Sequence, residues 1–404
     1  SSWWQGFFQD ALNGKIMRGI LYILDFVFFL WIFLAVVYLL IFALYAQGRK
    51  PGPYPRARQQ HRILVLFPAY KEDKVIVESV RSFLQQDYPP DLFRVTVISD
   101  GMKKETDEQL GQLSVNVLNA HFENSSKAAA LNLAIAHQDG QAYDIVAILD
   151  ADNSTAPDFL RKINDAYDSG IQAVQAHRTS KGKKTDVSVL DTVSEEINNS
   201  IFREGHVRAG LSSALIGSGM AFDYDWFARH IPMVTSAGED KELELLLLKD
   251  NVYIDYLPDV FVYDEKISGA TAFYRQRRRW IAAQFDLLGK GIRYLPQAIL
   301  SGNLDYCDKI FQWLLPPRIV LAGFTFLMSV IWIFIDWTVS LKWWLALFLL
   351  LCALSLAMPD ELYNASFKKA LRKLPLLFLL TVINLFRTKG VNKRFIHTRH
   401  GKET

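Results

Sequence analysis

The sequence has few of the residues that would indicate a disulfide framework or a nucleic-acid surface. Its 404 residues include two cysteines, Cys307 and Cys352, and their spacing fits no metal site. Cys352 lies in an apolar run, so a disulfide framework is not expected and a reducing or intramembrane setting fits better. The net charge of +3 gives no basis for nucleic-acid binding. No internal repeat or low-complexity segment is visible.

Long runs without charge near both ends of the chain indicate an integral membrane protein. Phe26–Ala46 contains no charged residue and is long enough to span a bilayer. A signal peptide is the alternative, but the run is too long for one and no small-residue cleavage site ends it. Ile319–Ile335 and Leu341–Met358 are predicted to be two further spans, with a tight turn that begins at Asp336 and Trp337 between them.

Basic residues beside these runs predict which side of the membrane the middle of the chain occupies. The positive-inside rule places basic flanks in the cytosol. The shorter run Leu374–Phe386 is expected to be interfacial, because a fourth span would put the basic tail outside. We therefore expect a bacterial inner membrane or a plasma membrane, with the central domain in the cytosol. The flanking residues are Arg49, Lys50, Arg56, Arg58 and Arg62 after the first span, and Arg387, Lys389, Lys393, Arg394 and Arg399 in the tail.

The middle of the chain has the pattern of an α/β domain. Short apolar runs such as Ile63–Phe67, Val95–Ile98 and Ile145–Leu149 alternate with helical stretches. Apolar runs without polar alternation are typical of strands buried on both faces of a parallel sheet. Ligands of such sheets bind beyond the carboxyl ends of the strands. Acidic residues follow two of the predicted strands, so we expect a site at that edge.

Three acidic motifs are candidates for chemistry, and each has a structural alternative. Asp150 and Asp152 could share Mg²⁺ or Mn²⁺ with a substrate diphosphate, although Asp-x-Asp also occurs by chance and in turns. Asp100 precedes Gly101, which favours a turn, but its carboxylate could contact the base or ribose of a donor. Asp240 opens a helical stretch, where acidic residues stabilise the helix N-terminus, and it could instead be a general base.

The most specific feature is the sequence Gln276-Arg277-Arg278-Arg279-Trp280. It lies in a basic and aromatic stretch from Tyr274 to about Leu300, which predicts an amphipathic helix on the membrane surface. Arginines on such a helix bind anionic lipid. An arginine fork also holds a diphosphate through paired hydrogen bonds, and an indole face packs on a sugar ring. We interpret the motif as part of a site, with lipid anchoring as a compatible second use.

Together the motifs resemble glycosyltransferase family 2, in the membrane-embedded branch that contains cellulose, hyaluronan and chitin synthases. Six segments occur in the order of that branch and cover about residues 60–300. Two positions depart from it, since Lys71 stands where Asn is common and Gly238 where Thr is common. The six segments are Pro68-Ala69-Tyr70-Lys71-Glu72, Asp100-Gly101, Lys127 with Leu131-Asn132, Asp150-Ala151-Asp152, Gly238-Glu239-Asp240, and Gln276 to Trp280.

The resemblance implies a fold and a role for each matching residue. The fold is α/β, a cytosolic GT-A-type, Rossmann-like catalytic domain with a mostly parallel sheet, flanked by transmembrane and interfacial helices. Asp240 would be the catalytic base, and Asp150 and Asp152 would hold Mg²⁺ or Mn²⁺. Donor binding is assigned to Tyr70, Glu72, Asp100, Lys127, Asp150, Gln276 and Arg279, and acceptor binding to Gly217, Ser218 and Trp280.

The expected domains follow from the spans and the motifs. They are an interfacial N-terminal segment at 1–18, a transmembrane helix at 19–46, the catalytic domain at 47–265, interfacial helices at 266–305, two transmembrane helices at 306–358, and an interfacial or short membrane helix with a basic tail at 359–404.

The implied activity is inverting transfer from a nucleotide-diphosphate sugar, expected to be a UDP-sugar, to build a β-linked polysaccharide and translocate it. The alternative is transfer of one sugar to a membrane lipid. Few spans leave little room for a monomeric channel, which favours that alternative or a homo-oligomer. A non-catalytic scaffold is a third interpretation, but none of the four aspartates that the motifs need is missing. The sequence does not determine which sugar is used.

Overall fold

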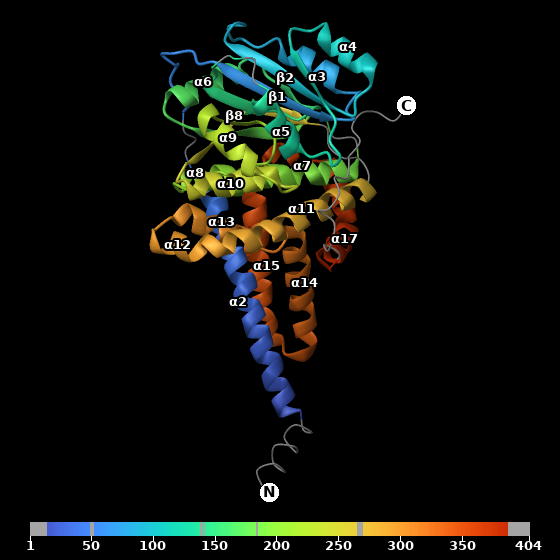
Figure 1. Cartoon of the computed structure of the whole chain (residues 1–404). Coiled ribbons are helices and arrows are strands. Elements are labelled where there is room, and N and C mark those ends of the chain that lie inside the picture. Colours follow the sequence, from blue (N-terminus) through green and yellow to red (C-terminus); the bar gives the residue numbers. More distant parts are fainter. Residues whose placement is uncertain are drawn as a thin grey trace.

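The computed structural model describes residues 14–48, 52–137, 140, 142–182, 185–264 and 270–386, with side chains from residue 277 onward in the last range. Figure 1 shows a sheet at one end of the molecule, a layer of helices beneath it, and a bundle of long helices at the other end. Residues 1–13 of the expected N-terminal interfacial segment and the basic tail after Phe386 lie outside the described residues, and the end of that segment from Lys15 onward belongs to a helix.

The α/β domain contains, among the described residues, an eight-stranded sheet in the order β3-β2-β1-β4-β7-β6-β8-β5. β1 pairs in parallel with β2 and β4, and β2 with β3, whereas β7 is antiparallel to both of its neighbours. The expected parallel sheet is therefore present around β1, and its other half is mixed. The strands are β1 (Ile63–Tyr70), β2 (Phe93–Asp100), β3 (Asn116–Ala120), β4 (Ile145–Ile148), β5 (Ser154–Thr155), β6 (Ala173–Ser180), β7 (Met220–Asp223) and β8 (Ile254–Asp264).

The strands around β1 are apolar along their length because helices cover both faces of the sheet. Alternate residues Leu64 and Leu66 belong to one buried cluster, and Ile63, Val65 and Phe67 belong to another on the opposite face. The helices of the domain are α3 (Ile76–Phe83), α4 (Lys104–Gly111), α5 (Lys127–Ala136), α6 (Phe159–Asp168), α7 (Asp186–Asn198), α8 (His206–Arg208), α9 (Tyr224–His230) and α10 (Glu239–Lys249).

The parallel strands end together at one edge of the sheet. In the register of β1 and β2, Tyr70 is paired with Asp100, and Leu66 of β1 is paired with Ile148 of β4. Asp150 follows β4 by two residues. Tyr70, Asp100 and Asp150, three of the residues expected to bind a donor, are thus brought to one edge, as the carboxyl ends of a parallel sheet require.

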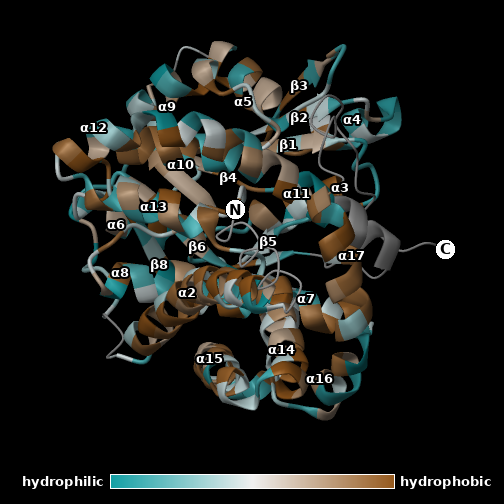
Figure 2. Ribbon diagram, turned by 90° about the horizontal axis from the view of Figure 1, so that it is seen from below, coloured by the Kyte–Doolittle hydropathy of each residue, from teal (hydrophilic) through white to brown (hydrophobic). Residues whose placement is uncertain are grey.

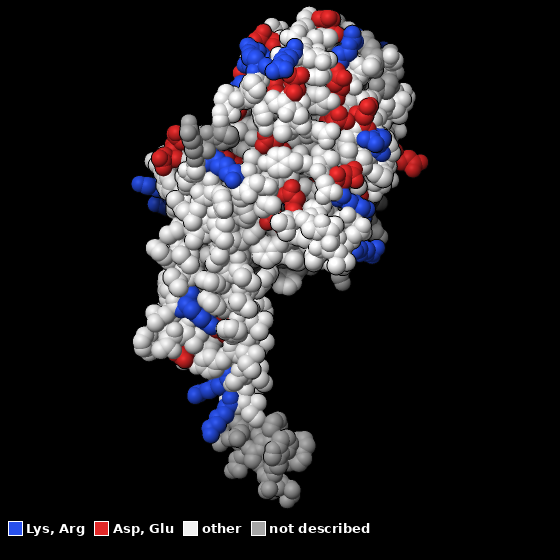
Figure 3. Space-filling model, turned by 90° about the vertical axis from the view of Figure 1, so that its left-hand side faces the viewer, with Lys and Arg blue, Asp and Glu red and all other residues white. Residues whose placement is uncertain are grey.

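In the described part of the chain, three helices are long and apolar enough to cross a membrane, namely α2 (Lys15–Ala46), α14 (Arg318–Ile335) and α15 (Trp337–Ala357). The three predicted spans fall on these candidate helices, although α2 begins at Lys15 instead of Phe26 and α15 begins four residues before the expected Leu341. Seen from below, the lower helices are mainly hydrophobic (Figure 2). Charged side chains gather on the globular end and are sparse along most of the narrow end (Figure 3).

Helices between the sheet and this bundle occupy the expected interfacial stretch. The single helix expected from Tyr274 to about Leu300 is divided, because α11 (Ala270–Gly291) is followed by a 3₁₀ turn and a second helix, α12 (Leu295–Leu300). α13 (Leu304–Leu314) then returns toward the bundle and contributes Trp313 to the core below the sheet. α17 (Leu374–Phe386) has the predicted bounds and packs against α11 and α14.

The bundle is joined to the domain by a close approach between α2 and a seven-residue π-helix, η1 (Asn199–Gly205). A Cβ on Gly205 would collide with the backbone carbonyl of Phe42 on α2. We expect Gly205→Ala to reduce the free energy of unfolding by about 1–3 kcal/mol, because two backbones must separate. Gly289→Ala on α11 is the control, since nothing lies within 4 Å of its added Cβ. Equal unfolding midpoints for the two variants in detergent would contradict this packing argument.

Candidate active site

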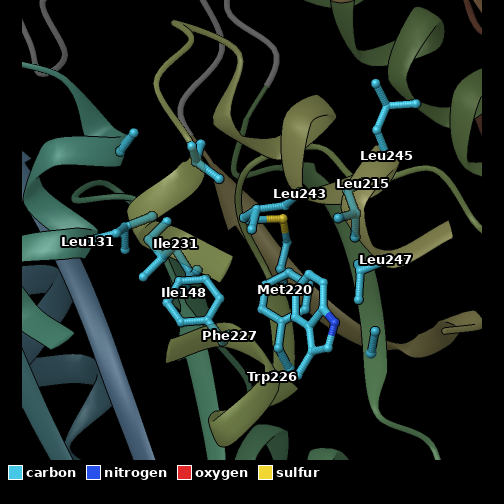
Figure 4. Packing of buried hydrophobic residues seen from close by; sticks show 14 of the residues in the cluster. Leu131, Ile148, Leu215, Met220, Trp226, Phe227, Ile231, Leu243, Leu245 and Leu247 are labelled. Carbon is cyan, nitrogen blue, oxygen red and sulfur yellow. The ribbon is translucent and has the colours of Figure 1, made fainter. Parts of the chain in front are cut away.

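A well-packed core fixes the two helices that carry the central charged residues. Leu131 of α5 and Leu243 and Leu247 of α10 pack with Ile148 and Met220 of the sheet (Figure 4). The first residue of α5 is Lys127, and α10 begins with Glu239 and Asp240. Because neither helix can shift without opening this core, these charged groups have fixed positions.

Lys127 is the centre of the site. Its Nζ donates to Asp150 Oδ1 at 2.5 Å and to the Gly217 carbonyl at 2.5 Å, and it lies 3.5 Å from Glu239 Oε1. Burial opposes the ammonium charge, but the facing carboxylates of Asp150 and Glu239 outweigh it and raise the pKa of Lys127. The lysine therefore stays charged and joins the strand end of β4 to the start of α10.

Gly217 allows these groups to come together. Its φ is +81°, in the left-handed region, and a Cβ there would lie 3.4 Å from Glu239 Oε1 and 3.7 Å from Lys127 Nζ. Gly217, which is predicted to contact the acceptor, thus lies beside the carboxylates of Glu239 and Asp240. The side chain of Ser218 is fully buried, so the geometry does not favour its expected direct contact with an acceptor.

Glu239 is a residue of the site to which the sequence assigned no role. Burial raises its pKa to about 7, with Asp240 and Asp150 adding to the rise and Lys127 opposing it. Its helix-start position in the sequence suggests capping, and nothing in the local pattern predicts that Lys127 lies opposite it.

The raised pKa of Glu239 gives a pH dependence of stability. Between its ordinary value of 4.5 and about 7, the folded chain holds a proton that the unfolded chain has released. The contribution of Glu239 to stability therefore falls as the pH rises through this window, by up to about 3 kcal/mol. We expect Glu239→Gln to flatten the fall in unfolding free energy between those pH values. Parallel pH profiles for the variant and the wild type would refute the assignment.

Asp240 lies beside this cluster and faces the cavity. Its Oδ2 is 3.8 Å from the position that a Cβ on Gly217 would take. It is partly exposed, and it has no hydrogen bond or ion pair with any residue in the described part of the chain. A carboxylate with this freedom can accept a proton from a substrate hydroxyl.

The strand end of β1 forms the opposite side of the cavity. Tyr70, Glu72 and Asp100, all predicted to bind the donor, line it together. Lys71 has φ of +56° and places its Nζ 4.9 Å from the centre of the Tyr70 ring. Asn adopts this backbone conformation more readily than Lys. The surrounding structure therefore keeps Lys71 in a conformation that the Asn common at this position in the family would adopt more easily.

The loop after β4 presents both predicted metal ligands. Asp150 N donates to Asn153 Oδ1 at 3.0 Å and to Ser218 Oγ at 3.2 Å, so the buried serine supports the loop. Asp152 Oδ1 accepts from Asn153 Nδ2 at 3.1 Å. No cluster of three metal-ligating side chains occurs among the described residues. Two carboxylates suit Mg²⁺ or Mn²⁺ if a diphosphate supplies further oxygen ligands, so the residues present fit such an ion.

Arg178 on β6 is another functional candidate that the sequence did not reveal. Its Nη2 lies 2.8 Å from Asp264 Oδ2, and its Nη1 donates to the Ile216 carbonyl at 3.1 Å. Burial opposes the guanidinium charge, but the nearby carboxylates outweigh it and raise the pKa of Arg178; in order of effect they are Asp264, Glu195, Asp150 and Asp152. It comes from the end of a strand with no local motif, and only the sheet order brings it to the aspartates.

The motif on α11 forms the membrane side of the site. Arg279 and Trp280 both line the cavity. Burial lowers the pKa of Arg279, while Glu239, Asp150 and Asp240 oppose that effect, so its guanidinium faces the carboxylate cluster. Gln276 lies on α11, and its side chain is outside the described part of the structure.

A single cavity of about 890 Å³ connects these groups. It runs from Tyr70 and Asp100 at the strand ends, past Lys127 and Asp240, to Arg318 at the start of α14. The predicted donor, base and acceptor residues with described side chains line it, apart from the buried Ser218.

Relatives of known description share this domain. The beta-monoglucosyldiacylglycerol synthase of Trichormus variabilis is 24% identical over 264 residues, which are 62% of this chain and 51% of that protein. The N-acetylglucosaminyltransferase of Sinorhizobium fredii is 22% identical over 64% of this chain and 66% of its own length. Cellulose synthase 1 of Komagataeibacter xylinus is 31% identical over 115 residues, or 28% of this chain and 7% of that protein. The chain spans about half the length of the glucosyldiacylglycerol synthase.

A solved structure has the same fold. The mannosyltransferase PcManGT from Pyrobaculum calidifontis, in complex with GDP-Man and Mn²⁺, matches 89% of this chain and 96% of its own with a TM-score of 0.56 at 16% identity. The expected GT-A-type α/β fold is thereby confirmed. The family model described as "Glycosyltransferase like family 2" matches residues 61–283, more than half of the chain. The chain therefore belongs to the glycosyltransferase-like family 2.

Proposed function

We propose that this chain is a membrane-embedded, inverting glycosyltransferase that uses a nucleotide-diphosphate sugar, with a UDP-sugar as the expected donor. The observation that carries the proposal is the convergence of Asp150, Lys127, Asp240 and Arg279 on one cavity. Separate donor, base and leaving-group residues in one enclosed space are what a displacement at an anomeric carbon requires. We also propose that residues 47–265 are the catalytic domain and lie in the cytosol.

In the proposed mechanism each residue has one task. Tyr70, Glu72 and Asp100 bind the nucleoside at the strand ends. Asp240 takes the proton from the acceptor hydroxyl, whose oxygen attacks the anomeric carbon from the face opposite the diphosphate. Arg279 donates hydrogen bonds to the departing diphosphate and stabilises its charge. An α-linked donor then gives a β-linked product.

Asp150 and Asp152 would hold Mg²⁺ or Mn²⁺ against the diphosphate. When bound, the ion would neutralise negative charge on the leaving group. Lys127 fixes the position of Asp150, which orients the loop whether or not the ion is present.

Because the chain offers two carboxylates and no complete cage among its described residues, metal binding should depend on the nucleotide. We expect tight binding of Mn²⁺, followed by electron paramagnetic resonance, only when UDP is also present. Asp152→Asn should weaken this binding, and chelation should abolish transfer. Full transfer in excess chelator would remove the metal from the mechanism.

Two acceptors fit the proposal. A growing β-linked polysaccharide agrees with the match to cellulose synthase 1 and with the synthase-like branch. A membrane lipid agrees with the match to the glucosyldiacylglycerol synthase and with the apolar wall at the membrane end of the cavity. The acceptor residues proposed for both are Gly217 and Trp280.

One experiment tests the activity, and its product separates the acceptors. The purified chain in lipid is supplied with a panel of nucleotide sugars, and release of nucleoside diphosphate is measured. We expect release from one donor to exceed the others clearly. Sizing the radiolabelled product then gives a ladder for a polymer or one lipid-soluble species for a glycolipid. No release from any donor, with Asp240→Asn as the blank, would overturn the proposal.

A further inference from the structure

The cavity does not end at the carboxylates but continues into the membrane bundle. Its far wall includes Phe202 of η1, Pro317 before α14, and Leu385 and Phe386 of α17. Phe386 is 84% exposed, so the apolar wall opens outward. Trp31 of α2 also lines this end and is 45% exposed.

Two arginines stand where the polar and apolar parts of the cavity meet. Arg277 Nη2 donates to Ser194 Oγ at 3.2 Å, and Arg318 Nη2 donates to the same oxygen at 3.0 Å. Ser194 belongs to α7, Arg277 to α11 and Arg318 to α14. Three elements thus bring two like charges to one hydroxyl, which is unfavourable unless negative charge lies nearby.

The acidic groups around Ser194 do not balance the arginines. Asp191 Oδ1 lies 3.6 Å from Arg277 Nη2, and Glu195 is paired with Arg203 at 3.0 Å. Arg318 forms no ion pair with a described residue, and its buried Nη1 has no hydrogen-bond partner in that part of the chain. Among the described residues Arg277 and Arg203 each lie near a carboxylate, whereas the Arg318 guanidinium has no ion pair, and its positive charge lies at the cavity wall.

We propose that the membrane end of the cavity binds an amphiphile that carries a phosphate group. Arg318 and Arg277 hold the phosphate, and the apolar chain lies along Pro317, Leu385 and Phe386. The inference rests on the proposed function, because it concerns the lipid acceptor of the same cavity. A sugar hydroxyl can accept a hydrogen bond from Arg318 but leaves the guanidinium charge uncompensated, whereas a phosphate oxygen accepts the bond and also neutralises the charge.

The geometry favours a lipid phosphate over a free anion. A soluble anion would need only the guanidinium groups for binding. The same cavity is also lined by the exposed apolar side chains of Trp31 and Phe386, which a free anion would not use. Burying such a wall against an alkyl chain favours binding, and the gain grows with each methylene group removed from water. The phosphate thus supplies orientation and the chain supplies much of the affinity.

Binding of dodecyl phosphate to the full chain tests the proposal. Native mass spectrometry from a nonionic detergent counts bound molecules, with dodecanol and inorganic phosphate as comparison ligands. We expect saturable binding of one dodecyl phosphate, at least about tenfold tighter than either comparison ligand. Arg318→Gln should weaken it by about tenfold or more, since one charged hydrogen-bonding partner is lost. The affinity of Arg318→Lys should lie between those of the wild type and Arg318→Gln, because lysine keeps the positive charge but lacks the paired N–H donors of a guanidinium group.

Arg372→Gln is the matched control, because Arg372 is exposed beside α17 and does not line the cavity. It should bind as the wild type does. Equal binding of dodecanol would overturn the phosphate contact, and equal binding of inorganic phosphate would overturn the lipid chain. If Arg318→Gln fails to fold, the single variants Arg318→Lys and Ser194→Ala replace it. Wild-type affinity for dodecyl phosphate in both of them would overturn the proposed phosphate site. Donor hydrolysis without dodecyl phosphate binding would refute this inference alone, whereas no release from any donor refutes the proposed function.

Discussion

Asp240→Asn is expected to reduce sugar transfer by about 10³-fold or more while leaving donor binding nearly unchanged. Asparagine has the same shape but cannot accept the proton of the acceptor hydroxyl. Because Asp240 makes no hydrogen bond or ion pair with a described residue, its replacement should not disturb the packing around it. Transfer is measured as nucleoside diphosphate release with acceptor present, and donor binding by calorimetry with UDP.

The control for this variant is Asp225→Asn on α9, an exposed aspartate that does not line the cavity. It should transfer at the wild-type rate. Wild-type transfer by Asp240→Asn would remove Asp240 as the base. Loss of UDP binding in that variant would instead show that Asp240 has a role in holding the donor.

Lys127→Met is expected to lower the free energy of unfolding by about 3–5 kcal/mol and to abolish UDP binding. The substitution leaves Asp150 and Glu239 facing each other across a buried space with no ammonium between them. It also removes the hydrogen bond to the Gly217 carbonyl, so the acceptor loop loses its fixed position. Chemical denaturation in detergent measures the first effect, and calorimetry with UDP measures the second.

Lys104→Met provides the matched control, because Lys104 is exposed on α4 and lies 3.7 Å from Glu108 across one helical turn. Its loss should change stability by less than about 0.5 kcal/mol. A Lys127→Met variant that unfolds like this control would show that the charge cluster contributes little to stability.

Much of the fold could be predicted from local patterns. Leu64, Leu66, Ile63 and Val65 form an unbroken apolar run, which is the pattern of a strand covered on both faces, and β1 has both faces buried. The charge-free runs predicted three spans, and the described residues include three helices of suitable length and composition. The antiparallel placement of β7 was not predicted, because strand order depends on contacts between residues far apart in the chain.

The candidate site could be predicted where its residues share a motif. Asp100 ends a strand, Asp150 follows one and Asp240 lies in the first turn of a helix, so their short segments mark them. Arg178 and Glu239 could not be assigned in this way. Arg178 lies on β6, which is separated from β4 in the sheet by β7, and its nearness to the aspartates depends on that order.

The sequence by itself determined the family, the three candidate spans and the ordered set of acidic and basic motifs, because these depend on residue type and spacing along the chain. The tertiary structure decided which charges face one another. Lys127 meets Asp150 and Glu239, and Arg277 meets Arg318 at Ser194, only after the sheet and the bundle have packed. Charge interactions depend on distance in space and on burial, and neither is set by position in the sequence.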